Sequence, residues 1–396
     1  MKRDRARIGL FGFLLGFLWM VAAAPGPAFA ADPGVTDEEV VIGAWFPLTG
    51  PLALTGTSER DAIRVWVNEV NAQGGIHGRK IRFIAYDDGA SPQEALTGVR
   101  RLINQDKVFA LIAGSISGAT LPVVPVINRA KVPFVCSMAA HRKLLQPFSR
   151  YIFRIYANEI DQSNAFADYT AGVAKLKRPA IIYNSTDFGI GGYEITRERL
   201  AKRWGLKFAA AERYNPGDQD FSAQLLRIKQ ARPDGILVHS FSQDAGIIVR
   251  QGKELGLNVP YIGGSATTTP LFPRAAGRAG IGFAGVFVYP HIMASDDPVV
   301  TRYKEKVAKL HPGGMPVGRP SEYDFAGYTA ALVTGEALRR AGRDLTREKF
   351  IEALETFRNF ETGVMWPISF SKDNHEGTSQ VRMIRINERL QWEELK

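Results

Sequence analysis

The chain lacks the residues that two common stabilising centres require. Its 396 residues include a single cysteine, Cys136. A disulfide needs two thiols and a cysteine-based zinc site needs several, so both are excluded within this chain. Cys136 ends an apolar run, and we expect it to be a small buried side chain rather than a nucleophile. The stability of the fold must therefore come from the packing of its apolar residues.

Motifs of the common enzyme classes are also missing. The sequence has no Gly-x-x-x-x-Gly-Lys-Ser/Thr phosphate loop, no Gly-x-Ser-x-Gly nucleophile elbow and no His-Glu-x-x-His metal helix. None of the six histidines is paired at metal-ligand spacing, and Gly189, Gly191 and Gly192 lack the full dinucleotide fingerprint. These absences favour a protein that holds a molecule over an enzyme that converts one. We expect no cofactor and no metal.

Long apolar runs are missing after the first thirty residues. Residues 1–7 carry four basic side chains, residues 8–24 are apolar, and the Ala-Phe-Ala sequence at 28–30 provides the small residues that a signal peptidase requires. The pattern predicts a secretory signal peptide over residues 1–30. A membrane anchor is the alternative, but the Pro-Gly-Pro sequence at 25–27 would break a spanning helix. We expect an exported protein that is soluble after cleavage.

Positive charge is not concentrated anywhere in the sequence. The formal net charge is +10, of which the predicted signal peptide contributes three units, leaving about +7. Basic residues alternate with acidic ones, as at 197–199 and 304–306. A nucleic-acid-binding surface would need clustered basic residues, so we expect no nucleic-acid partner.

The first half of the mature chain alternates predicted strands and helices. Its apolar runs have the length of buried strands, at 40–46, 81–86, 108–113 and 132–135. Helical periodicity or capping signals lie between them, at 63–70, from Ser91-Pro92 onward and at 119–130. This order predicts a parallel sheet with right-handed crossovers.

The second half repeats this organisation. Strands are predicted at 180–183, 208–211, 235–239 and 259–262, and helices at 193–204, 221–230 and 245–255. The Ser-Ile-Ser sequence at 115–117 is echoed by Ser-Phe-Ser at 240–242, and Val-Pro-Phe-Val at 132–135 by Val-Pro-Tyr-Ile at 259–262. The similar displacements predict two equivalent α/β domains.

The C-terminal part has too few elements to form a third domain. Strands are predicted at 283–289, 364–370 and 381–386, and helices at 298–310, 325–340 and 348–357. We expect these elements to complete the two sheets, so that the chain crosses between the domains several times and forms a hinge of several strands.

Loops at the carboxyl ends of parallel strands are where such sheets bind ligands. Two facing domains would form a cleft with residues 115–120 on one wall and 240–243 on the other. Ser117 and Thr120 provide hydroxyl groups at a helix start, which suit a carboxylate or a similar anion. Simple helix capping explains the same residues, and both explanations remain open at this point.

Six segments of the chain resemble the branched-chain amino acid (Leu/Ile/Val-type) periplasmic binding proteins of ABC importers. They lie at 41–43, 47–51, 71–79, 86–88, 220–228 and 323–324. The Asn-Ala-x-Gly-Gly-Ile-x-Gly run that begins at Asn71 is particularly specific to that family. The similarity extends over essentially the whole mature chain.

The resemblance implies an α/β fold of two Rossmann-like lobes joined by a multi-strand hinge, the Venus-flytrap of type I periplasmic binding proteins. Lobe 1 is predicted to contain residues 31–154 and 290–365, and lobe 2 residues 155–289 and 366–396. It also implies a periplasmic, monomeric binding protein that captures a small-molecule solute and delivers it to an ABC permease in the inner membrane. A ligand-sensing clamp for a membrane receptor and a secreted α/β hydrolase are the alternatives.

The resemblance also implies which residues bind the solute. Ser117 corresponds to the hydroxyl that receives a ligand carboxylate, and Ala139 and Ala140 belong to a loop that adds backbone contacts. Phe188 and Phe241 correspond to aromatic walls. Two further candidates, on the loop region after the first strand, are Trp45 and Leu54.

Ser265 departs from the pattern of the family. Amino-acid binders of this type carry an acidic residue at this position, which pairs with the ligand ammonium. A buried ammonium without a counter-charge is costly, so an ordinary α-amino acid is disfavoured against an amide, a urea or an aromatic carboxylate. An anionic solute would need a cation, for which residues 141–143 are the candidate.

Overall fold

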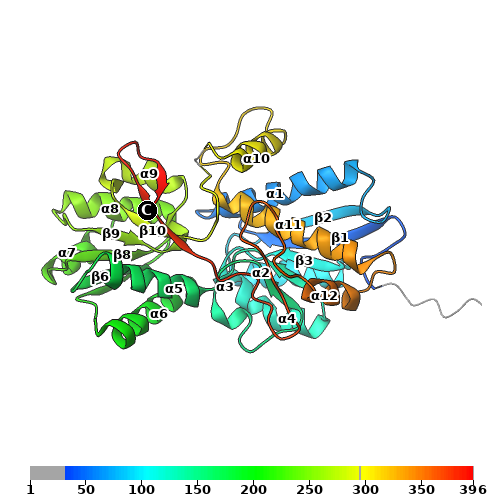
Figure 1. The fold of residues 1–396 in the computed structure, drawn as a ribbon, viewed down its shortest axis with the longest axis horizontal. Coiled ribbons are helices and arrows are strands. Elements are labelled where there is room, and N and C mark those ends of the chain that lie inside the picture. The colour runs from blue at the N-terminus through cyan, green and yellow to red at the C-terminus, as the bar shows by residue number, and fades with distance from the viewer. Residues whose placement is uncertain (1–31, 294–295, 396) are drawn as a thin grey trace, which may run out of the picture. The chain divides into compact units, whose positions relative to one another are not determined.

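The computed structural model describes residues 32–293 and 296–395 (Figure 1). The predicted signal peptide, residues 1–30, lies outside the described residues. Within the described ranges, the structure has no helix that combines the length and the apolar character needed to cross a membrane. Two β-sheets, each flanked by helices, organise the described chain.

The first sheet is entirely parallel, with strand order β2-β1-β3-β4-β5. Its strands are β1 (Glu39–Phe46), β2 (Lys80–Asp87), β3 (Ala110–Ala113), β4 (Phe134–Cys136) and β5 (Ile152–Arg154). Because all strands run the same way, their carboxyl ends lie along one edge of the sheet. The connections that follow β3, β4 and β5 therefore meet at this edge.

Helices cover both faces of the first sheet. The bounds are α1 (Ala53–Ala72), α10 (Pro298–Ala308), α11 (Glu322–Ala341) and α12 (Arg347–Glu355), together with α2 (Pro92–Asn104), α3 (Ser117–Thr120) and α4 (Val124–Ala130). Alternate residues of β1 point to opposite faces: Ile42 packs in the core that contains α1 and α11, whereas Val41 packs against α2. Both faces are buried, as the continuous apolar run predicted.

The second sheet has seven strands, in the order β12-β11-β10-β9-β8-β6-β7. Their bounds are β6 (Pro179–Asn184), β7 (Ala211–Tyr214), β8 (Gly235–His239), β9 (Tyr261–Gly263), β10 (Ala284–Phe287), β11 (Arg382–Ile386) and β12 (Trp392–Glu394). Strands β11 and β12 are antiparallel to their neighbours, and the others are parallel. Strand β3 lies between β1 and β4 in the first sheet, and β8 lies between β6 and β9 in the second, so the two repeats occupy equivalent places.

The helices of the second sheet also lie on its two faces (Figure 1). Their bounds are α5 (Glu159–Asp168) and α6 (Asp187–Trp204) on one side, and α7 (Ser222–Gln230), α8 (Ser242–Glu254) and α9 (Leu271–Ala276) on the other. Short 3₁₀ turns span Leu121–Val123, Arg142–Leu144, Ser265–Thr267 and Gly277–Gly280, and a π-helical turn spans Tyr169–Val173.

Consecutive elements belong to different sheets after β5, after β10 and after α12. Residues 155–158 lead from β5 into α5, and the segment that follows Asn374 leads to β11. Arg154, the last residue of β5, forms an isolated parallel bridge with Glu376, so the end of β5 is hydrogen-bonded to the segment that leads to β11. This arrangement agrees with the α/β fold expected from the sequence, and the exact lobe boundaries stay a prediction.

Several predicted elements are corrected by the structure. Residues 364–370 do not form a strand, because Pro367 interrupts the run and only an isolated bridge joins Phe360 to Ile368. The single helix predicted at 119–130 is divided into α3, a 3₁₀ turn and α4, and Pro122 and Pro125 lie in the divided part. Strands β5 and β12 and helices α5 and α9 were not predicted.

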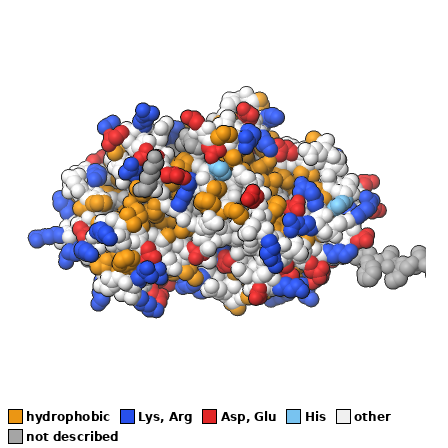
Figure 2. Space-filling view, in the orientation of Figure 1, with side chains coloured by type: hydrophobic (Ala, Val, Ile, Leu, Met, Phe, Trp, Pro, Cys, Tyr) orange, Lys and Arg blue, Asp and Glu red, His pale blue; other side chains and the backbone are white. Residues whose placement is uncertain are grey.

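Charged side chains of both signs are interspersed on the visible face of the molecule (Figure 2). Arginine and lysine side chains lie next to aspartate and glutamate side chains, as the alternating sequence indicated. Many of them form exposed ion pairs, such as Arg227 with Glu212 at 2.7 Å. The surface therefore agrees with a solvated basic protein.

Candidate functional site

A cavity of about 40 Å³ lies where connections from both sheets converge. It is lined by Thr55, Ser115, Ile116, Ser117, Met138, Ala140, Tyr156, Phe188, Phe241, Ser265, Ala266 and Tyr323. Most of these residues follow a strand: β3, β4 and β5 of the first sheet and β8 and β9 of the second. The position agrees with the rule that open parallel sheets bind ligands beyond the carboxyl ends of their strands.

The turn after β3 brings its serine side chains into the cavity wall. Ala113 and Gly114 both have positive φ, 89° and 80°. A Cβ atom on Gly114 would lie 2.6 Å from the ring of Phe134, so only glycine fits there. The turn carries Ser115 and Ser117 over the end of the strand.

Five of the eight residues predicted from the sequence line this cavity: Ser117, Ala140, Phe188, Phe241 and Ser265. They come from both sheets, as a site between two domains requires. Their joint presence at one cavity is what the structure adds to the sequence.

The other three predicted residues lie elsewhere. Trp45 is 1% exposed and packs its ring 5.0 Å from that of Phe134, on the α2 side of the sheet. Ala139 is buried, and its carbonyl accepts a hydrogen bond from Arg154 Nη1 at 3.2 Å. Leu54 lines a neighbouring groove together with Leu271. None of the three lines the cavity.

Aromatic rings form one wall. The rings of Phe188 and Phe241 are stacked at 5.9 Å, and Phe188 also stacks on His239 at 4.5 Å. Burial lowers the pKa of His239 to about 4, so its ring is neutral at pH 7. The close packing requires Gly192 on α6, since a Cβ atom there would lie 2.1 Å from His239 Nε2. The glycine at position 192 is therefore required for the packing of α6 against His239.

Hydroxyl groups form the polar part of the wall. Ser117 Oγ accepts a hydrogen bond from the backbone N–H of His141 at 3.4 Å. Ser265 Oγ donates to Gln162 Oε1. Ser115 Oγ is buried and lies beside the Glu59 carboxyl group. These groups are available to a polar solute, because a buried hydroxyl is costly unless it is hydrogen-bonded.

No ionised side chain lines the cavity, since all twelve lining residues are uncharged types at neutral pH. Two buried carboxyl groups lie on the helices that contribute Thr55 and Tyr323 to the cavity wall. Glu59 is one turn beyond Thr55 on α1, and Glu322 is next to Tyr323 on α11. Burial raises the pKa of each to about 8, so both are mainly protonated at pH 7. The protein interior next to the cavity is therefore largely uncharged.

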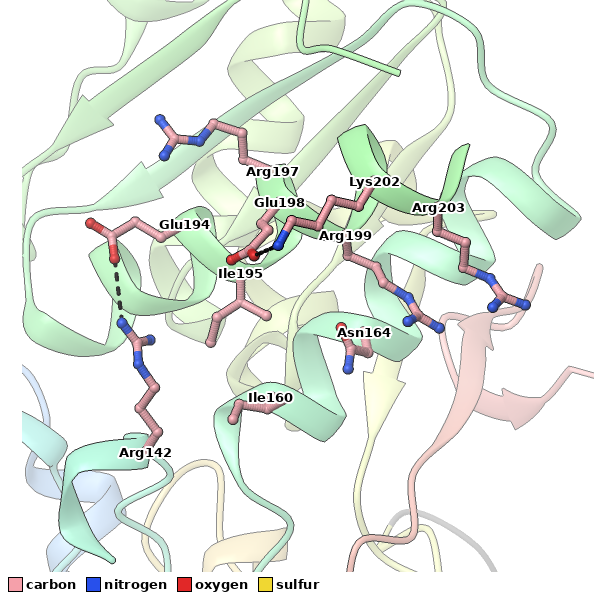
Figure 3. Close-up of a pocket in the computed structure, with 10 residues that line it drawn as sticks. All are labelled: Arg142, Ile160, Asn164, Glu194, Ile195, Arg197, Glu198, Arg199, Lys202 and Arg203. Atoms are coloured by element: carbon pink, nitrogen blue, oxygen red, sulfur yellow. Dashed lines mark hydrogen bonds and ion pairs between the residues drawn. The ribbon is translucent and has the colours of Figure 1, made fainter. Parts of the chain in front are cut away.

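The basic residues expected near an anionic solute do not line the cavity. Arg142 pairs with Glu159 at 3.0 Å and with Glu194 at 3.6 Å. It belongs to a separate open cleft of about 880 Å³, whose other cations are Arg197, Arg199, Lys202 and Arg203 on α6 (Figure 3). Burial lowers the pKa of His141 to about 4, so His141 is neutral at pH 7.

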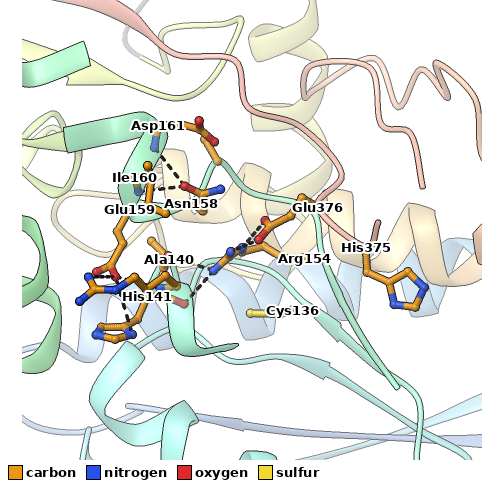
Figure 4. A network of polar contacts seen from close by, with 12 residues as sticks. Cys136, Ala140, His141, Arg154, Asn158, Glu159, Ile160, Asp161, His375 and Glu376 are labelled. Carbon is orange, nitrogen blue, oxygen red and sulfur yellow. Dashed lines mark hydrogen bonds and ion pairs between the residues drawn. The ribbon is translucent and has the colours of Figure 1, made fainter. Parts of the chain in front are cut away.

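A buried guanidinium group holds the loop that forms the cavity wall (Figure 4). Arg154 is 0% exposed and donates to the carbonyl oxygens of Ala140 at 2.9 Å and His141 at 3.0 Å. It also forms an ion pair with Glu376 on the segment that leads to the second sheet. The backbone N–H of Glu159, at the start of α5, donates to the same Ala140 carbonyl at 2.8 Å. The wall is thus tied to segments that connect the two sheets.

Sequence reasoning missed Thr55, Tyr156, Ala266 and Tyr323 as lining residues. Tyr156 follows β5, a three-residue strand too short to be recognised. Thr55 lies in the first turn of α1, where nothing in the local pattern marks it as functional. Tyr323 lies in the first turn of α11, in a segment noted only for its resemblance to the family. In the described ranges no three His, Cys, Asp or Glu side chains are arranged to hold a metal ion.

Comparison with known proteins identifies the family. A family model described as "Periplasmic binding protein" matches residues 39–391, so the chain belongs to this family of binding proteins, which are not enzymes. It is 27% identical over 304 residues to an amino acid binding protein of Pseudomonas aeruginosa, covering 77% of this chain and 79% of that protein. It is 26% identical over 321 residues to a Leu/Ile/Val-binding protein homolog of Brucella suis, covering 81% and 84%.

Solved structures show the same fold. A type 1 periplasmic binding protein from Bordetella pertussis superposes with a TM-score of 0.80 at 25% identity, covering 90% of this chain and 100% of that one. A leucine-binding protein from Thermotoga maritima gives a TM-score of 0.77 at 24% identity, covering 90% and 98%. The expected type I periplasmic binding protein fold, and the resemblance to the Leu/Ile/Val type, are confirmed.

Proposed function

We propose that this protein is the exported substrate-binding component of an ABC importer, which captures a small solute in the cavity and delivers it to a permease in the inner membrane. The observation that carries the proposal is the cavity itself, whose wall combines connections from both sheets. Its relatives named as Leu/Ile/Val-binding and amino acid binding proteins support the transport role. We propose that the protein is located in the periplasm and acts as a monomer.

The wall favours an uncharged polar solute over a fully charged one. Ser117 and Ser265 offer hydrogen bonds, Phe188 and Phe241 offer an apolar surface, and no ionised side chain lines the space. Transfer of an ion into such surroundings costs several kcal/mol unless a counter-charge accompanies it. An amide therefore fits this cavity better than an amino acid or an aromatic carboxylate.

Cavity size supports the same choice. A space of about 40 Å³ is enough for roughly three water molecules. A solute of a few non-hydrogen atoms occupies it with little change, whereas an aromatic acid requires the walls to separate. We infer that the solute first contacts one wall and that movement about the connecting segments then encloses it.

A thermal-shift screen tests the proposal. Purified mature protein is heated with amino acids, amides, urea and aromatic acids, each in excess. A ligand that binds only the folded state at a hundred times its Kd stabilises it by about 2.7 kcal/mol. We expect a rise in melting temperature with small amides and none with leucine. Release of chemically altered solute would contradict a binding role.

A further inference from the structure

The side-chain amide of Gln162 fixes the direction of a hydrogen bond at the cavity wall. Gln162 lies on α5 and is 2% exposed. Its Nε2 donates to the carbonyl oxygen of Ala157, which can only accept. The amide nitrogen is therefore committed to Ala157, and Oε1 faces Ser265. Ser265 must donate its hydroxyl hydrogen to Gln162 Oε1.

Toward the cavity, Ser265 can therefore act only as a hydrogen-bond acceptor. A hydroxyl oxygen has two lone pairs, so Ser265 keeps an acceptor position even with the Tyr156 hydroxyl beside it. Its single hydrogen is already used. The group that faces Ser265 in a bound solute must therefore be a hydrogen-bond donor, such as an N–H.

Ser117 has the opposite polarity. Its Oγ accepts from the backbone N–H of His141, which leaves its hydroxyl hydrogen free to be donated to a solute oxygen. Ser115 Oγ lies in the same wall, is 7% exposed and lies beside the Glu59 carboxyl group. The first sheet thus contributes a donor hydroxyl and the second sheet an acceptor hydroxyl.

We infer that the cavity selects the head group of a carboxamide or a urea, with its carbonyl oxygen at Ser117 and an N–H at Ser265, and that Gln162 is the positioning residue that sets this selectivity. The inference rests on the proposed function. A carboxylate has no N–H for Ser265, and no cation lines the cavity to neutralise it. An ammonium group satisfies Ser265 but finds no ionised carboxylate in the wall.

Matched small molecules test the head group. Propionamide, urea, propionate and propylammonium are titrated calorimetrically into the purified mature protein near neutral pH. We expect propionamide and urea to bind, and propionate and propylammonium to bind at least about tenfold more weakly, because each lacks one partner or a counter-charge.

Two variants test the residues. Ser265→Ala removes the acceptor and should weaken propionamide binding about tenfold. Gln162→Met removes the acceptor of the Ser265 hydroxyl hydrogen, so Ser265 can donate this hydrogen to a solute oxygen, and the affinity ratio should shift toward propionate. A merely structural role of Gln162 would lower both affinities together. Ser163→Ala is the matched control: Ser163 is also on α5, is 1% exposed with no partner for its hydroxyl, and does not line the cavity.

The outcomes separate this inference from the proposed function. Equal affinities for propionamide and propionate, or an unchanged propionamide affinity in Ser265→Ala, overturn the head-group assignment while solute binding stands. Binding of leucine in place of every amide overturns it in the same way. Failure of all the probes and of the whole thermal-shift screen overturns the assignment and the proposed function together.

Discussion

The protein has two hollows of opposite character. The cleft beside α6 measures about 880 Å³ and is lined by five cations, from Arg142 and the α6 residues, with Glu194 and Glu198 among them. The cavity between the strand ends measures about 40 Å³ and is lined by hydroxyl, apolar and aromatic groups only. Size and charge therefore favour the α6 cleft as the binding site, whereas buried polar groups favour the small cavity.

The difference shows why volume alone does not locate a binding site. In the cleft, most of the charged side chains already form ion pairs, such as the exposed pair of Lys202 with Glu198, so a ligand would compete with these pairs and with water. In the cavity, the Ser117 hydroxyl accepts from the backbone N–H of His141 and keeps its own hydrogen for a solute. A buried polar group that is left unsatisfied is costly, and a solute that satisfies it gains the full benefit.

The largest expected effect concerns the ion pair behind the cavity wall. Arg154→Met leaves the His141 carbonyl and the partly exposed Glu376 without this donor, whereas the Ala140 carbonyl keeps the Glu159 N–H. Removing the buried partner of an ion pair in this way costs about 3 kcal/mol. Thermal unfolding followed by circular dichroism measures the loss, because urea is itself a proposed ligand. Lys202→Met, which removes the exposed Lys202–Glu198 pair beside the cleft, is the control and should cost under about 1 kcal/mol. Equal losses would show that the two regions do not differ.

The next effect concerns the uncharged state of the interior. Burial raises the pKa of Glu59 to about 8, so the folded protein holds this proton more tightly than the unfolded chain. Stability from this group is present at low pH and is lost as the pH rises toward 8, by at most about 1.4 kcal/mol per pH unit.

Glu59→Gln should remove that contribution. Thermal unfolding of wild-type and variant protein at several pH values between 5 and 8 gives the difference in stability, in which the opposite contributions of His141 and His239 cancel. We expect the wild-type curve to fall more steeply with pH than the variant curve. Parallel curves would mean that Glu59 is ionised throughout.

A smaller effect separates binding from stability. Ser117→Ala should weaken solute binding about fivefold, the value of about one hydrogen bond, with little change in melting temperature. Ser91→Ala is the complementary variant, because Ser91 caps α2 by accepting from Glu94 N–H at 3.4 Å. It should cost about 1 kcal/mol of stability and leave affinity unchanged. The reverse pattern would assign Ser117 a structural role only, through its hydrogen bond with His141.

The smallest effect is expected in the cleft. Arg197→Ala removes an exposed cation that lies over the Tyr193 ring at 5.4 Å. Stability should change by under about 1 kcal/mol and solute affinity by less than about twofold. Calorimetric titration with the same solutes as for Ser117→Ala provides the measurement. A large loss of affinity would place the solute in the cleft.

Much of the fold followed from local patterns. The continuous apolar run of β1 predicted a strand buried on both faces, and the paired Ser-x-Ser sequences predicted equivalent loops after β3 and β8. Strands β5 and β12 were missed, whereas β4 and β9, which are equally short, were predicted from the apolar runs at 132–135 and 259–262. The strand wrongly predicted at 364–370 shows the converse: it is apolar, but its partner is the nearby Phe360 rather than either sheet.

The site was predictable only where a residue follows a predicted strand. Ser117, Phe241 and Ser265 do so, and they line the cavity. Trp45 ends a strand as well, but it occupies the face toward α2, and the sequence does not reveal which face of β1 is which. Gln162 was not recognised at all, because its role depends on a contact with Ser265 across 103 residues of the chain.

A crystal structure of the protein with bound propionamide tests the account most directly. We expect propionamide to lie in the small cavity, with its carbonyl oxygen hydrogen-bonded to Ser117 and its nitrogen hydrogen-bonded to Ser265. Electron density for it in the arginine-lined cleft, with the cavity closed and empty, would contradict the account.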